Sequence, residues 1–242
     1  TAFKEMMPSS GPVRTRVIGK ESVEVYQQAQ RVKEYMNYQI TQVMEEYTPE
    51  LDQMLFYLPL SGSTFKKVYY DAQLGRAVSK FVPAEDLVVP YTATDLNSCE
   101  RVTHVVRLSE NDVRKKQVAG FYRDIDIQPS PPSTPTYSTG NIKSAINNLE
   151  GVQATGESDT VSILEFHVNL DLVGYEDQRD GEETGIKLPY IVTLDESSGK
   201  ILSIRRNYEE GDPLFKKKQY FVHYKFLPGL GFYGFGLIHL IG

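Results

Sequence analysis

"LEFHVNLDL", from Leu164 to Leu172, is the stretch that most clearly decides the fold of this chain. Its apolar residues alternate with polar ones, and a period of two is typical of a β-strand that buries one face. Residues 188–194 and 200–207 also have strand character and flank the turn sequence "DESSG", which predicts a hairpin. With a last strand expected at residues 220–224, this part of the chain is predicted to be rich in β-structure.

The sequence before this β-rich part is helical first and then mixed. Between Glu21 and Tyr47 apolar residues recur every three or four positions, which predicts one long helix with an apolar face. Thr48 and Pro49 predict the cap and first turn of a second helix. Residues 65–70, 77–81 and 101–108 are predicted strands, and a short basic helix should begin after Ser109.

The clearest boundary in the chain is "QPSPPSTPTYSTG", residues 128–140, which contains four prolines. Such a stretch cannot pack as a helix or a central strand, so an extended connection is expected, followed by a short helix at residues 142–149. The expected fold class is α+β. The predicted divisions are a helical and mixed region at residues 1–127, a Pro-rich connection at 128–159, a small β-rich module at 160–212 and a return segment at 213–242.

Composition limits the classes of function that are open to the chain. The net charge of −6 over 242 residues provides no global attraction to nucleic acid, so any contact with DNA would be local or non-adhesive. Cys99 is the single cysteine, which excludes an internal disulfide and a cysteine metal cluster. No apolar run is long enough to span a bilayer, and we expect no contact with a membrane.

The residue types that carry out catalysis are present but not in catalytic patterns. None of the four histidines has a second histidine at ligand spacing; His167 with Glu165 is the best pair for a metal, and no third ligand is indicated. Ser61-Gly62-Ser63 lacks the frame of a nucleophile elbow. We therefore expect no catalytic residue, no metal and no cofactor.

The end of the chain, "HYKFLPGLGFYGFGLIHLIG" (residues 223–242), is apolar and rich in glycine. Gly229, Gly231 and Gly234 satisfy the G-x-G-x-x-G template of dinucleotide sites, but they follow a proline and not a buried strand, which weighs against that interpretation. The chain begins at Thr1 and stops on an apolar run. We therefore expect it to be an internal part of a longer polypeptide.

Several whole segments resemble the portal, or head-to-tail connector, proteins of tailed bacteriophages, in particular the podovirus-type branch. They include "LPLSGSTFKKVYYD" (residues 58–71), "FVPAEDLVVPYTATDL" (81–96), "ERVTHVVRLSENDVRKKQVAGFYRDI" (100–125) and the glycine-rich end. The resemblance covers most of the chain from about residue 34 onward. It implies a wing-like region with the start of the stem at residues 1–127, a clip-like β module at 160–212, and a return to the second stem helix at 213–242.

What this resemblance implies is a structural subunit of a ring, usually a dodecamer, at one vertex of the capsid. Double-stranded DNA would pass through its channel during packaging and ejection. The expected partners are further copies of the chain, the packaging ATPase (terminase), tail adaptors, and scaffold or capsid proteins. The expected location is the virion, and the host cytoplasm during assembly. A net negative subunit suits a channel that must not hold phosphate tightly.

The loop "YEDQRDGEETG", residues 175–185, is the candidate site for docking these partners. It contains five acidic residues and one arginine, and its net charge is about −4. The acidic residues are Glu176, Asp177, Asp180, Glu182 and Glu183. A merely solvated loop tip is the competing interpretation. For the whole chain, the alternatives are an enzyme that binds a nucleotide through residues 229–236, and a protein-binding module of a non-viral protein.

Overall fold

The computed structural model describes residues 2–127, 160–179 and 181–241. The predicted short helix at residues 142–149 therefore lies outside the described residues. The chain forms two compact units. Unit 1 contains residues 1–87, 91–99 and 219–242, and unit 2 contains residues 88–90 and 100–218. The fold is mixed α+β, as the sequence predicts, with several sheets and few helices.

The sheet of unit 1 has the strand order β10-β1-β2. β1 (Ser63–Asp71) and β2 (Arg76–Pro83) form the predicted hairpin, and β10 (Phe221–Lys225) pairs antiparallel with the other edge of β1. The register places Phe65 opposite His223 and Val82. The last strand of the chain thus completes a sheet that begins about 160 residues earlier, a pairing that the local pattern could not predict.

Helix α3 (Tyr47–Ser61) joins this sheet through both apolar and charged residues. Leu51 and Met54 of this helix are buried. On the same helix the Glu50 carboxylate accepts a hydrogen bond of 2.6 Å from the amide of Phe81 in β2. The helix begins before Thr48, with no side-chain cap, and ends where Gly62 takes a left-handed conformation with φ of +78°.

Helix α2 (Val23–Tyr38) is shorter than predicted, and a π-helical turn at Gln39–Val43 separates it from α3. Ser22 caps it by accepting a hydrogen bond from the amide of Val25. α2 contains no buried residue. Its predicted apolar stripe is therefore only partly covered, and Val25, Val32 and Met36 are 38%, 48% and 41% exposed. Short helices α1 (Ala2–Met6) and α6 (Ile238–Ile241) complete unit 1.

Unit 2 contains a sheet with the order β3-β4-β5-β8-β9. The strand quoted first above is its centre: β5 (Thr160–Leu170) pairs antiparallel with β4 (Arg101–Ser109) on one side and β8 (Leu188–Asp195) on the other. β8 continues through the predicted hairpin into β9 (Ile201–Arg206). β3 (Leu87–Val88) is a short edge strand.

Helix α4 (Glu110–Val118) packs near β4 and β5 and closes the core of unit 2. Ser109 caps it as predicted, because its hydroxyl accepts a hydrogen bond of 3.1 Å from the amide of Asp112. The core cluster consists of Val113, Tyr122, Val161, Ile163 and Leu202. Apolar residues from the helix, the following loop and the sheet are thus buried together.

The boundaries of the two units differ from the divisions predicted from the sequence. The pattern placed residues 101–127 with the N-terminal region, whereas the structure groups β4 and α4 with the β-rich residues 160–206. The reason is long-range pairing: β4 lies beside β5 over nine residue pairs, from Arg101 with Val168 to Ser109 with Thr160. Residues 219–242 likewise belong to unit 1 because β10 pairs with β1.

Candidate functional site

The acidic loop forms a small two-stranded hairpin between β5 and β8. β6 (Gln178–Arg179) pairs antiparallel with β7 (Glu182–Glu183), so that Gln178 lies opposite Glu183 and Arg179 opposite Glu182. Gly181 has φ of +84°, the left-handed conformation that a tight hairpin turn requires. Asp180, which is also a predicted site residue, lies outside the described residues. The side chains of both short strands are exposed.

Two of the predicted acidic residues hold the base of this hairpin. Both carboxylate oxygens of Glu176 accept hydrogen bonds of 2.8 Å from the amide of Gly174. Backbone N–H groups of Glu176 itself and of Gly174 keep the pKa of this carboxyl below its ordinary value. Asp177 accepts a bond of 2.7 Å from the hydroxyl of Thr184. These two residues therefore have a structural role, and the exposed negative charge is presented by Glu182 and Glu183.

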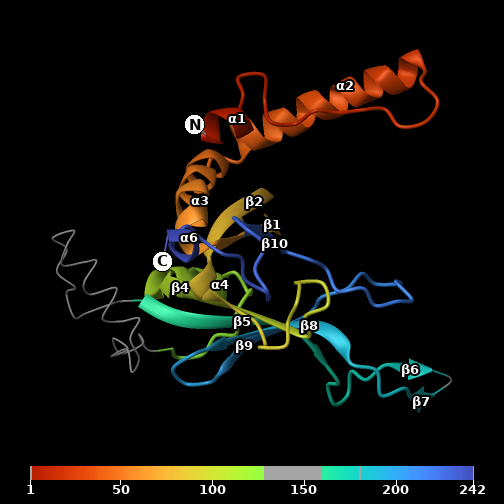
Figure 1. Cartoon of the computed structure of the whole chain (residues 1–242). Coiled ribbons are helices and arrows are strands. Elements are labelled where there is room, and N and C mark those ends of the chain that lie inside the picture. The colour runs from red at the N-terminus through yellow and green to blue at the C-terminus, as the bar shows by residue number, and fades with distance from the viewer. Residues whose placement is uncertain (1, 128–159, 180, 242) are drawn as a thin grey trace. The chain divides into compact units, whose positions relative to one another are not determined.

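The arrangement can attract a basic partner. Its charges lie on a projecting hairpin in unit 2 (Figure 1), where solvent and salt screen them. Attraction of this kind accelerates encounter more than it strengthens a complex. Docking at residues 176–183 stays a prediction.

The glycine-rich stretch crosses the C-terminal end of α3 at very short range. A Cβ on Gly62 would lie 2.5 Å from the carbonyl oxygen of Gly234, and one on Gly236 would lie 2.5 Å from the carbonyl oxygen of Leu60. Three hydrogen bonds hold the crossing: Phe226 N to Gly62 O at 3.0 Å, Leu237 N to Pro59 O at 2.7 Å, and Gly234 N to Ser63 Oγ at 2.7 Å.

These contacts explain the glycines by packing of backbone against backbone. A phosphate cradle needs amide N–H groups that point at a ligand, whereas the amides of Gly234 and Gly236 donate to Ser63 and His239. Of the three glycines of the G-x-G-x-x-G template, Gly234 therefore binds the protein's own chain, while a Cβ on Gly231 would have no neighbour within 4 Å.

A serine and a histidine that are distant in the sequence lie close together in unit 1. His223 Nε2 lies 3.1 Å from Ser63 Oγ, and the imidazole contacts both Phe65 and Phe232, with ring centres 4.4 and 4.8 Å away. Burial, and to a lesser degree Lys225, lower the pKa of His223 to about 4. Ser63 is completely buried, so a substrate could not reach its hydroxyl. The pair is a structural contact.

Sheet register also brings together the histidines of unit 2. His167 Nε2 lies 2.7 Å from Glu165 Oε1, and His104 is opposite Glu165 on the neighbouring strand. The sequence singled out the first pair, but it could not show that His104 is adjacent. Within the described ranges, no group of three or more histidine, cysteine, aspartate or glutamate side chains has the arrangement of a metal site.

A hollow of about 360 Å³ lies beside α4 in unit 2. Val113 and Val161 contribute apolar surface, while Glu110, Arg114 and Asp124 contribute charge. Arg114 and Asp124 form an ion pair with each other. The described residues that line the hollow include no serine, cysteine or histidine, so this part of the lining offers no nucleophile with a base.

Lys66 is a buried charge that sequence reasoning missed. Its side chain is 2% exposed, and the Nζ atom lies 3.8 Å from the centre of the Tyr47 ring with no hydrogen-bond partner. Burial lowers its pKa to about 8, although Glu50 and Glu46 act in the opposite direction. No signal in the sequence distinguishes Lys66 from the next residue, Lys67, which is also a lysine on the same strand. Lys66 lies inside unit 1.

Comparison with known proteins does not identify a family. The chain matches no protein-family model, and no curated protein matches it at a significant level. Among the described residues, no helix has the length and apolar character needed to cross a membrane.

Proposed function

We propose that this protein is a structural subunit of a phage portal ring, which forms the DNA channel at the capsid vertex and the docking site for the packaging ATPase and tail proteins. The proposal starts from the sequence resemblance described above. The observation that carries it furthest is the uncovered apolar stripe of α2, in which Val25, Val32 and Met36 are each more than a third exposed. A helix with such a stripe is usually buried against a neighbour.

A head-to-tail ring supplies such a neighbour to every subunit. An interface of this kind joins two different surfaces and must close on itself to avoid filaments. Apolar residues of the short helix α6 are also exposed, at 70% for Ile238 and 84% for Ile241.

The acidic hairpin supports the docking part of the proposal. It projects from the β-rich unit and its outer residues Glu182 and Glu183 are free to meet a partner in solution. In the portal family this type of unit corresponds to the clip, where motor and tail proteins bind. The partner's contacting surface should therefore be basic, and binding should weaken as salt rises.

Negative-stain electron microscopy of the complete protein tests the ring. Closed rings are expected, and a complete protein that sediments only as a monomer under assembly conditions would refute the proposal. Docking is tested separately with Glu182→Lys/Glu183→Lys, measuring binding of the packaging ATPase and ring assembly in parallel. The matched control is Glu196→Lys/Glu210→Lys, which makes the same charge change at exposed residues of unit 2.

Weaker motor binding at low salt with intact rings is the expected result for the hairpin variant. If the hairpin variant and the control bind the motor equally well, the hairpin is only a solvated tip. If the hairpin variant loses assembly, these residues belong to the contact between subunits and the docking assignment is wrong.

A further inference from the structure

The segment before α2, residues 11–20, forms a strap that runs along the helix in the opposite direction (Figure 1). Asn37 holds it at one end: its Oδ1 accepts a bond of 2.9 Å from Val13 N, and its Nδ2 donates one of 3.2 Å to Val13 O. Further along, the Thr15 hydroxyl donates to the carbonyl of Ala29 at 3.1 Å. Strap and helix thus form the two walls of one surface feature.

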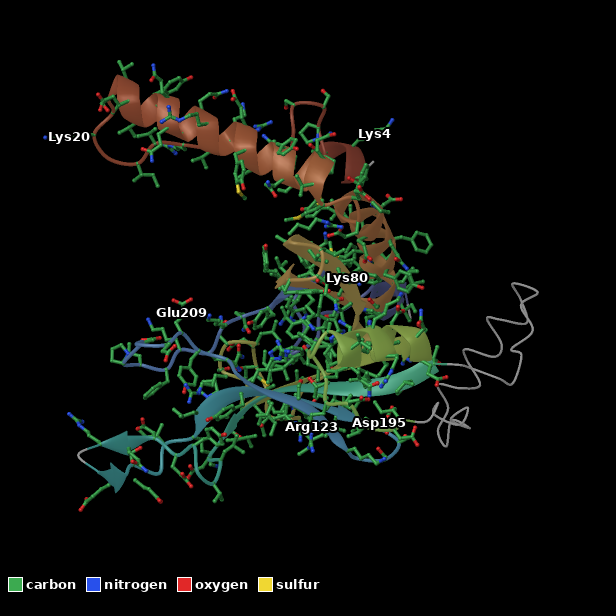
Figure 2. The ribbon with its side chains drawn as sticks, turned by 180° about the vertical axis from the view of Figure 1, so that it is seen from behind. Lys4, Lys20, Lys80, Arg123, Asp195 and Glu209 are labelled. Carbon is green, nitrogen blue, oxygen red and sulfur yellow. The ribbon has the colours of Figure 1, made fainter. Side chains whose placement is uncertain are left out.

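Between these walls lies a groove of about 890 Å³. Arg14 and Arg16 line it from the strap, and Lys33 and Tyr26 line it from the helix, with Glu21 as the single carboxylate. Lys20 lies in the turn that joins the two walls (Figure 2). The groove is therefore lined by cations from both walls.

The cations of this groove are not neutralised by the protein. Among the described residues, no carboxylate lies within ion-pair distance of Arg14, Arg16 or Lys33. Residues 11–33 contain five lysines and arginines against two glutamates, a net charge of +3, in a chain whose net charge is −6. A local reversal of sign in an acidic protein indicates an anionic ligand at that place.

We propose that this groove binds the phosphate backbone of a nucleic acid. Arginine and lysine supply most contacts to phosphate oxygens, and each phosphate that they neutralise releases a counterion. Arg14 and Arg16 are two residues apart in a non-helical strap, and with Lys33 on the opposite wall they present several positive charges to one linear polyanion. Tyr26 is 70% exposed at the same groove and offers an aromatic face for an unpaired base.

A nucleic acid fits these observations better than an acidic protein segment. Carboxylates on a protein must be placed individually to reach cations on two walls, whereas a phosphodiester backbone presents an unbroken row of charge. Contacts to phosphates carry no information about the bases, so binding should be independent of base sequence. The proposal stands on the strap and α2 alone and does not depend on the portal assignment.

The test measures the anisotropy of a fluorescent 30-base-pair duplex and of a single strand of the same length during titration with the chain. The groove variant is Arg14→Gln/Arg16→Gln/Lys33→Gln. The matched control is Arg31→Gln/Lys80→Gln/Lys187→Gln, which removes three exposed cations that do not line the groove, so both variants have the same net charge.

If the three cations make three phosphate contacts, the slope of log K against log salt should be less steep in the groove variant than in the wild type by about 2.7. Between 50 and 200 mM salt, the wild-type affinity should then drop about 40-fold more than that of the groove variant. The control should keep nearly the wild-type slope. A preference for the single strand would assign stacking to Tyr26.

Equal affinities and slopes for the wild type, the groove variant and the control would overturn the proposal. So would absence of duplex and single-strand binding together with groove-dependent binding of a peptide of residues 175–185, which would identify an acidic protein segment as the ligand. Far-UV circular dichroism checks folding. If the groove variant loses helix, Arg16→Gln alone replaces it, with an expected slope change of about 0.9.

Discussion

Replacing Gly62 by alanine should break the crossing between the glycine-rich stretch and the end of α3. Gly62 has φ of +78°, and a Cβ there would lie 2.5 Å from the carbonyl oxygen of Gly234 and from the amide nitrogen of Gly236. These neighbours are backbone atoms, so they cannot move aside by changing a rotamer. The crossing segment must shift as a whole.

The magnitude follows from two contributions. An L-residue in the left-handed region costs about 1 to 2 kcal/mol. Displacing the crossing segment also breaks the three hydrogen bonds at Gly62, Pro59 and Ser63, each of which contributes about 1 kcal/mol. The free energy of unfolding of unit 1 should therefore fall by about 4 kcal/mol in Gly62→Ala.

Gly75→Ala is the matched control. Gly75 lies in the β1–β2 turn with φ of +65°, and a Cβ there would have nothing within 4 Å. The free energy of unfolding should fall by only about 1 kcal/mol in this variant, because it has the backbone cost of the left-handed conformation and no steric clash. Urea unfolding followed by circular dichroism measures both variants, and equal losses of stability in the two would refute the close crossing.

Three further predictions concern buried or capping groups. The pKa of His223 is lowered from 6.5 to about 4, so the folded state binds this proton more weakly than the unfolded state. The free energy of unfolding should therefore fall by about 1 to 2 kcal/mol as the pH falls from 6.5 toward 4. In acid unfolding, His223→Gln should remove this dependence on pH. The pKa of Lys66 is lowered from 10.5 to about 8, so the free energy of unfolding should rise between pH 8 and 10.5. Lys66→Met should raise thermal stability at pH 7 by about 1 to 2 kcal/mol and should flatten that rise. Ser109→Ala should cost about 1 kcal/mol in urea unfolding because the amide of Asp112 loses its acceptor. The exposed Ser98→Ala, which removes a hydroxyl bond to Asp95 and leaves no helix amide without an acceptor, should cost less.

The sequence by itself determined the local elements. Alternation at residues 101–108 and 164–172 predicted β4 and β5, the "DESSG" turn predicted the β8–β9 hairpin, and Ser109 predicted the start of α4. These signals depend on neighbours within a few residues, and period and turn chemistry are sufficient to express them. The acidic residues of the docking candidate were also evident from composition, although the hydrogen bonds of Glu176 and Asp177 were not.

Only the tertiary structure decided which strands pair and which polar residues are buried. β10 joins β1, and β4 joins β5, across long stretches of chain. Those pairings change the division into units and bring His223 to Ser63. The β10–β1 pairing also explains the glycines at residues 62, 234 and 236, because the absence of a side chain at each of them leaves room for the backbone of another segment. Such choices depend on the free energy of the whole packed chain, which no short window of sequence contains.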